Sequence, residues 1–288
     1  MRSAVAALVA IFALAGADAA HALSFGTLAS AVAVPGAGAP LASFEAHPDA
    51  SAAASAASES EGAAAHAVAD FAASGAAVAA APGASAYAAS LWTDTFTITH
   101  PSGAAGTARV AFDLVLSGTL DPGAAPGGFA RASFRAVAGL AGEDSLFEDG
   151  FAALGVSAVF ERACADVCDA PLTHASTPIR VETEFSWGVP FRFDALLELT
   201  AAGGASADFT QGAWLAAITL PEGAALHAAS THAYAALLHT PVPEPSTALL
   251  LLLGLAPFAR TPRRRAHGSA RSRARPPAKP RRPRPPQR

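Results

Sequence analysis

Large apolar side chains recur at every second position through most of the chain after Leu91. Successive side chains of a strand point to opposite faces, so this period predicts strands with one apolar and one polar face. The positions that we expect to face inward are Phe96, Ile98, Val110, Phe112, Leu114, Leu116, Phe134, Ile179, Val181, Thr183, Phe185, Trp187, Phe191, Phe193, Ala195, Leu197, Leu199, Trp214, Ala216, Ile218 and Leu220.

Turn-forming residues separate these runs, and no amphipathic helix pattern lies between them. The turn signals are Pro101-Ser102-Gly103, Asp121-Pro122-Gly123, Pro126-Gly127-Gly128, Gly203-Gly204 and Pro221-Glu222-Gly223. One-sided strands joined by such turns are typical of antiparallel sheets rather than of parallel α/β folds. Residues 91–240 are therefore predicted to form a mainly β domain, an antiparallel β-sandwich that resembles a jelly roll.

Residues 23–90 differ from the rest because they are rich in alanine, serine and glycine. Residues 50–65 carry few large side chains and bury little apolar area, so we expect this region to be partly disordered. Short helices are an alternative because alanine has a high helix propensity. Edge strands near residues 76–81 or 86–91 are a further alternative for this region.

The formal net charge of −4 hides a strong asymmetry. Residues 23–242 contain 21 of the 23 acidic residues but six of the 19 basic ones, a net charge of −15. After Glu244 there are 12 basic residues and no acidic residue. The acidic body argues against nucleic-acid binding, which needs cations to neutralise phosphates.

The first 22 residues have the pattern of a secretory signal peptide. Arg2 precedes an apolar run over residues 4–14, and Ala20-His21-Ala22 places small residues before a cleavage site at Leu23. Residues 17–19 offer a competing site, and a buried helix of a cytosolic domain is the alternative interpretation. We expect export through the inner membrane.

The C-terminal region has three parts in a fixed order. Val242, Pro243, Glu244 and Pro245 form a segment incompatible with a helix, because each proline fixes φ and restricts the residue before it. Residues 247–259 are apolar and leucine-rich. The cationic stop that follows consists of Arg260, Arg263, Arg264 and Arg265. By the positive-inside bias, this order predicts a single transmembrane helix whose C-terminal side stays in the cytoplasm.

Residues 242–265 resemble the PEP-CTERM sorting signal, and residues 207–234 look like the last strands that commonly precede it. The resemblance implies export by a Gram-negative bacterium that makes extracellular polysaccharide. It also implies an exosortase as partner, which recognises and cuts the tail at the inner membrane. The protein would then be anchored transiently before it reaches the cell surface, the extracellular matrix or a biofilm.

Residues 266–288 continue beyond the arginine cluster with proline pairs and many arginines. We expect a disordered basic tail, and a lipid- or RNA-binding arm is the alternative.

Cys164 and Cys168 are the two cysteines of the chain. In an oxidising compartment they favour a small disulfide loop. A metal site with Asp166, Asp169 and His174 is the alternative, although zinc sites usually show two-residue gaps between cysteines and a second close pair.

Other groups of polar residues have a simple surface interpretation. Glu143, Asp144, Glu148 and Asp149 cluster in one loop, but their spacing matches no EF-hand, so an acidic surface loop is favoured over a calcium site. His227, His232 and His239 share no helical face. Glu182 and Glu184 share a strand face, where solvent-exposed charges are favoured over a glycosidase pair.

These observations predict an exported surface or matrix protein without enzymatic activity, cofactor or metal. A carbohydrate-binding module for exopolysaccharide is the alternative, and a secreted hydrolase is a second one. Two exposed aromatic side chains that line one groove would favour the carbohydrate-binding alternative. The candidates are Trp92, Trp187, Trp214, Tyr87 and Tyr234, of which Trp187 and Trp214 are expected to face inward.

Overall fold

The computed structural model describes residues 25–48, 50, 52–140, 156–164 and 173–239. These residues form two seven-stranded sheets, and all strand pairs are antiparallel except the short pair β12–β14. The only helical element in this part of the chain is the short 3-10 helix η1 (Tyr234–Leu237). The prediction of a mainly β, antiparallel protein is therefore confirmed.

Sheet A has the strand order β2-β1-β6-β11-β8-β9, with β13 beside β6. Its strands are β1 (Gly26–Val34), β2 (Leu41–Pro48), β6 (Ser85–Thr99), β8 (Phe129–Leu140), β9 (Val156–Ala163), β11 (Phe191–Ala202) and β13 (Ala225–Ala228).

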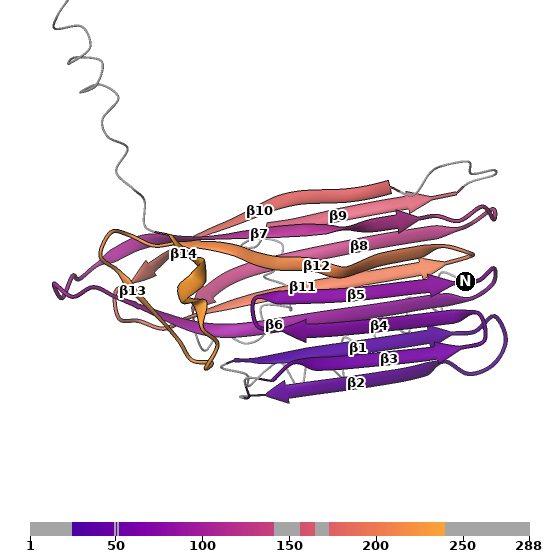
Figure 1. The fold of residues 1–288 in the computed structure, drawn as a ribbon, viewed down its shortest axis with the longest axis horizontal. Helices are drawn as coiled ribbons and strands as arrows, with labels where there is room; N and C mark the ends of the chain where they lie inside the picture. The colour runs from indigo at the N-terminus through magenta and orange to yellow at the C-terminus, as the bar shows by residue number, and fades with distance from the viewer. Residues whose placement is uncertain (1–24, 49, 51, 141–155, 165–172, 240–288) are drawn as a thin grey trace, which may run out of the picture. The chain divides into compact units, whose positions relative to one another are not determined.

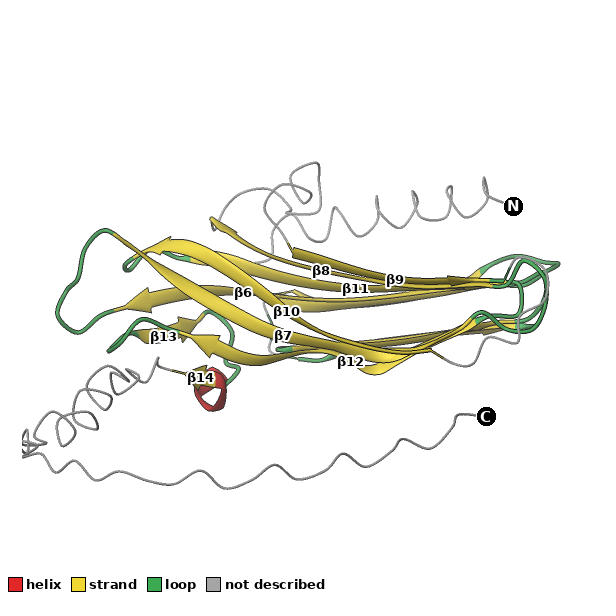
Figure 2. Ribbon diagram, turned by 90° about the horizontal axis from the view of Figure 1, so that it is seen from above, coloured by secondary structure: helices red, strands yellow, loops and turns green. Residues whose placement is uncertain are grey.

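Sheet B has the order β10-β7-β12-β5-β4-β3, with β14 beside β12. Its strands are β3 (Ala54–Ser60), β4 (Ala63–Asp70), β5 (Ala73–Ala80), β7 (Thr107–Asp121), β10 (Thr173–Ser186), β12 (Ser206–Thr219) and β14 (Leu238–His239). The two sheets lie face to face as two layers (Figure 2). Along the chain, β1 to β4 build one edge of both layers and β9 and β10 build the other (Figure 1).

The core between β6, β7 and β11 is aromatic. The rings of Phe112 and Phe193 have centroids 4.4 Å apart, and Trp92 lies 5.2 Å from Phe193. Phe96 contacts Phe112 at 5.6 Å. Phe96, Phe112 and Phe193 are almost fully buried, as the period-two pattern predicts. Trp92, a candidate for an exposed aromatic side chain, is buried as well. Aromatic side chains bury large apolar areas, so this cluster is a main source of the driving force for packing the two sheets.

The core at the other edge consists mainly of alanine methyl groups. The buried alanines of this edge are Ala29, Ala31, Ala33, Ala54, Ala56, Ala63, Ala65, Ala67, Ala76, Ala80, Ala86 and Ala88. Cα atoms of β1 lie within 8 Å of Cα atoms of both β3 and β4. Sheets usually stack about 10 Å apart, so the small side chains let the layers approach closely.

The expectation that residues 23–90 form a separate, partly disordered segment is therefore wrong for the described residues. Residues 26–80 form β1 to β5, which belong to the same two sheets as the later strands. The backbone ladder and the close approach of the sheets compensate for the small volume of each side chain. The β domain begins at Gly26 rather than at residue 91.

The predicted inward direction of Trp214 is also wrong. The pairing of β12 with β5 shifts between Phe209 and Ala213, and its pairing with β7 shifts again between Leu215 and Ala217. A bulge changes the face on which the following side chains lie. Ala213 and Leu215 are buried instead, while Trp214 is 39% exposed.

Ala216 is likewise exposed, whereas Ile218 and Leu220 face inward as predicted. Trp187 is half-buried rather than fully inward, and its ring packs against Phe185 and His100 with centroid distances of 5.0 and 5.5 Å.

The last described residues cross one end of both sheets (Figure 1). We call residues 225–239 the C-terminal strap. Its first part, β13, pairs with β6 of sheet A, and its last part, β14, pairs with β12 of sheet B. The strap therefore connects the two layers directly before the chain leaves the described region.

The predicted signal peptide (1–22), the predicted sorting signal (242–265) and the predicted basic tail (266–288) lie outside the described residues. The same holds for the acidic loop with Glu143, Asp144, Glu148 and Asp149. Within the described part, no helix is long and apolar enough to span a membrane.

Candidate functional site

The described region ends close to the predicted sorting motif. Leu238 and His239 pair with Ile218 and Thr219, and the Leu220 amide donates a hydrogen bond to the His239 carbonyl at 3.1 Å. The chain is therefore hydrogen-bonded to sheet B as far as His239. Val242, Pro243, Glu244 and Pro245 come directly afterwards, and they lie outside the described residues, as do Arg260, Arg263, Arg264 and Arg265.

Cys164 follows β9 and is buried. Its amide donates to the Gly128 carbonyl at 2.8 Å, and its carbonyl accepts a hydrogen bond from the Gly127 amide at 2.9 Å. Cys164 is disulfide-bonded. Cys168 lies outside the described residues, so its place in the loop stays a prediction.

The strand face with Glu182 and Glu184 carries an exposed charge network. Arg180 donates to Glu182 at 2.7 Å and to both carboxylate oxygens of Asp113, at 2.9 and 3.1 Å. Side chains of all three residues are exposed to solvent to a large extent. This arrangement is typical of a solvated strand face, on which ion pairs contribute little to stability.

The three histidines of the strap have separate partners. His227 lies 3.2 Å from the Thr99 hydroxyl, and His239 contacts the Leu237 carbonyl at 2.9 Å. The His232 ring packs between Phe71 and Tyr234, at centroid distances of 6.0 and 4.7 Å. Among the described residues, no group of three or more histidine, cysteine, aspartate or glutamate side chains could hold a metal ion.

Asp94 is the centre of a buried polar cluster that the sequence analysis did not single out. It is fully buried on β6 and accepts hydrogen bonds from the Tyr234 hydroxyl (2.8 Å), the Thr95 amide (2.8 Å) and the Ser230 amide (3.1 Å). The Ser230 hydroxyl donates to the same carboxylate. Two of these partners, Ser230 and Tyr234, belong to the strap.

Burial raises the pKa of Asp94, and the hydrogen bonds from Ser230, Tyr234 and Thr95 partly oppose this shift. Burial also raises the pKa of Tyr234, and the nearby Asp94 carboxylate adds to this effect. The hydroxyls of Ser230 and Tyr234 are buried and engaged, so the cluster holds the strap in place rather than presenting a nucleophile. The sequence does contain a signal for this buried carboxylate. Asp94 lies two residues from both Trp92 and Phe96, so its side chain lies on the same inward face of the strand.

Further polar pairs connect neighbouring strands of sheet A. Tyr87 donates to Glu198 at 3.0 Å, and Arg135 lies 3.2 Å from the second Glu198 oxygen. Arg192 and Asp194, both on β11, form a buried pair at 2.8 Å, and Arg192 also donates to the Thr93 hydroxyl of β6 at 3.1 Å. Burial raises the pKa of Asp194, while the charge of Arg192 opposes this shift. These contacts join β6, β8 and β11, so their role is structural.

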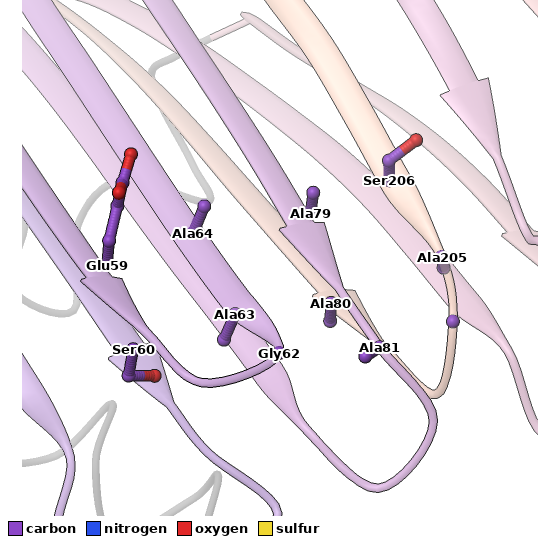
Figure 3. Close-up of a pocket in the computed structure, with 11 residues that line it drawn as sticks. Glu59, Ser60, Gly62, Ala63, Ala64, Ala79, Ala80, Ala81, Ala205 and Ser206 are labelled. Carbon is purple, nitrogen blue, oxygen red and sulfur yellow. The ribbon is translucent and has the colours of Figure 1, made fainter.

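Two hollows lie on the surface of sheet B. The first, of about 510 Å³, lies at the turns that follow β3, β5 and β11 (Figure 3). Alanine methyl groups line most of it, and its polar side chains are Glu59 and Ser60 on one side and Ser206 on the other (Figure 3). A site of this composition offers few converging groups for binding or catalysis.

The second hollow, of about 400 Å³, is a groove across β4, β5 and β12. Val68 and Asp70 of β4 lie on one side, and Trp214 and Gln211 of β12 lie on the other. We call it the Trp214 groove. It combines an exposed aromatic side chain with polar groups, so it is the stronger of the two hollows as a binding site.

Comparisons with protein-family models, with curated proteins and with solved structures gave no match.

Proposed function

We propose that this chain is an exported surface or extracellular-matrix protein without enzymatic activity. Its β domain would be the displayed part, and residues 242–265 would deliver it. The observation that supports this proposal most is the order along the chain: β14, the last described strand, ends at His239, and Val242, Pro243, Glu244 and Pro245 follow after residues 240 and 241. A processing enzyme needs an extended segment next to a folded domain, and the two prolines of this motif would favour one, because each fixes φ and restricts the residue before it.

The charge distribution supports the proposed topology. The β domain is strongly acidic, while the segment after Glu244 is strongly basic. Cationic residues after an apolar segment are retained on the cytoplasmic side, so the body would lie outside and the tail inside. The apolar run of residues 247–259 is shorter than the ~20 residues usual for a span, which bilayer thinning and arginine snorkelling accommodate.

For the fold, we infer a jelly-roll sandwich that is enlarged at one edge. Numbered from β5, the eight strands β5 to β12 follow the order 1-8-3-6 in sheet B and 2-7-4-5 in sheet A. This is the order of an eight-stranded jelly roll. The strands β1 to β4 extend the edge next to β5 and β6 in both layers.

The chemistry of the described residues is compatible with a protein that displays a surface. The polar cluster with the most reactive side chains, around Asp94, is buried and hydrogen-bonded. The carboxylates Glu182 and Asp113 lie in an exposed ion-pair network with Arg180. The first arrangement stabilises the β domain and the second belongs to a solvated strand face, which favours display over hydrolysis.

The experiment for this proposal changes the sorting motif in the full chain in the organism that produces it. We expect Glu244→Ala to retain the tail and to accumulate in the membrane fraction, whereas the wild type reaches the external fraction. The matched control is Glu222→Ala, which alters a second, exposed Pro-Glu pair in the turn of residues 221–223. Equal processing of both variants would contradict the role of the motif.

A further inference from the structure

The Trp214 groove is produced by small residues on its floor and by a bulge on one side. Ala73 and Gly75 of β5 lie between β4 and β12. A Cβ atom at Gly75 would lie 2.4 Å from the Thr210 carbonyl oxygen, so only glycine fits beneath the bulge. Neighbouring strands are about 4.8 Å apart, and the two sides of the groove are therefore roughly 10 Å apart.

The sides of the groove carry one aromatic side chain and several polar side chains. Trp214 is 39% exposed and lines the groove together with Gln211, so its indole is accessible to a ligand in the groove. Asp70 uses one carboxylate oxygen to accept the Phe71 amide at 2.7 Å, which leaves the other for a ligand. Gln211 is exposed at the bulge, and Thr210 is held by Asp208, to which its hydroxyl donates at 2.9 Å.

We propose that the Trp214 groove binds a saccharide chain. A sugar ring has an apolar C–H face that stacks on an indole and a rim of hydroxyls that both donate and accept hydrogen bonds. Trp214 provides the stacking face, Asp70 accepts from hydroxyls, and the Gln211 amide donates and accepts. The small floor leaves room for one ring between the two sides.

The charge of the groove selects the class of saccharide. Asp70 is the charged residue among those that line it, and Asp208 stands beside Thr210. The negative charge of these carboxylates would repel the carboxylates of a bound uronic acid. The groove therefore favours neutral sugars over anionic ones.

This inference deepens the proposed function, since a displayed matrix protein gains a partner class, but it depends on the groove and not on the tail. Failure of the tail to be processed would leave saccharide binding intact. Failure of saccharide binding would leave the processing of the tail intact. The two proposals are thus separable by experiment.

The test uses the full chain and measures binding by titration calorimetry. The probes are neutral glucose hexamers with β-1,4, β-1,3 and α-1,4 linkages, an oligogalacturonate of equal length, and a proline-rich peptide. We expect at least one neutral hexamer to bind and the oligogalacturonate to bind more weakly. Absence of binding to every neutral hexamer at millimolar concentration, or binding of the peptide alone, would overturn the proposal.

Variants locate the binding to the groove. Trp214→Ala is expected to weaken hexamer binding about tenfold or more, because one stacking face is lost. Ala73→Leu, which fills the exposed floor, should weaken it as well. Phe44→Ala is the matched control, because Phe44 is a 48% exposed aromatic residue on β2 in the other sheet. Equal losses in Trp214→Ala and Phe44→Ala would contradict a specific site.

Asp70→Asn tests the selectivity. The asparagine keeps an oxygen that accepts the Phe71 amide but removes the negative charge, so the preference for neutral over anionic hexamers should decrease. Thermal unfolding of each variant serves as the folding check. An unchanged preference in Asp70→Asn would show that its charge does not select the ligand.

Discussion

At the scale of single residues, Asp94 is the side chain that holds the C-terminal strap against sheet A. One carboxylate on β6 accepts hydrogen bonds from two strap residues, Ser230 and Tyr234, as well as from the Thr95 amide. A buried charge is costly unless it is fully hydrogen-bonded, and these partners meet that requirement. The side chain therefore fixes the strap to sheet A, although the sequence pattern around it predicts only a strand.

Removal of the Asp94 carboxylate should destabilise the protein strongly. Asp94→Ala leaves the buried hydroxyls of Ser230 and Tyr234 without their acceptor, and we expect a loss of about 2–4 kcal/mol in the free energy of unfolding. Denaturant unfolding of the full chain measures this. The control Asp113→Ala breaks an exposed ion pair and should cost less than about 1 kcal/mol. Similar losses in both variants would refute the role of the cluster.

Asp94 should also make stability depend on pH. Its pKa is raised in the folded protein, so the folded state binds this proton more tightly than the unfolded chain does. The contribution of Asp94 is complete below its ordinary pKa of about 3.9 and is lost as the pH rises through the raised value. The stability of the wild type relative to Asp94→Asn should therefore fall from about pH 4 upward. A relative stability that rises with pH would contradict this assignment.

At the scale of elements, the strands differ in how visible they are in the sequence. β6, β7, β10 and β11 carry large inward side chains that alternate with polar ones, and their phase was predicted correctly. β3 to β5 have mainly alanine on the inward face, and alanine also recurs on the outer face, so the contrast in side-chain size that reveals a strand is weak. In β12 the bulges, which periodicity alone does not reveal, reversed the direction of Trp214.

The alanine-rich edge should be intolerant of larger side chains on its inner face. Ala67 on β4 is fully buried where the layers approach closely, so Ala67→Leu should cost roughly 1–3 kcal/mol by overpacking. Ala57 lies on the exposed face of β3, and Ala57→Leu should change stability by less than about 0.5 kcal/mol. Chemical unfolding of both variants measures the contrast. Equal tolerance would mean that the layers are not tightly packed there.

At the scale of the whole molecule, we propose display for the described β domain and delivery for the terminal segments. The domain extends from Gly26 to His239, well beyond the boundary predicted from the larger side chains, and its last residues are pinned to both sheets. The terminal signals can be predicted from linear patterns that need no tertiary context, and they stay predictions because they lie outside the described residues. The Trp214 groove cannot be predicted in this way, since three strands and a bulge must come together before it exists.

The most direct test of the central proposal is the intact mass of the native protein, isolated from the membrane and external fractions of the organism that produces it. The proposal predicts an external species that begins near Leu23 and ends between Pro243 and Ser246. A species that begins near Leu23 but retains Arg288, and occurs only in membranes, would contradict it. In that case the C-terminus would be a permanent anchor and not a sorting signal.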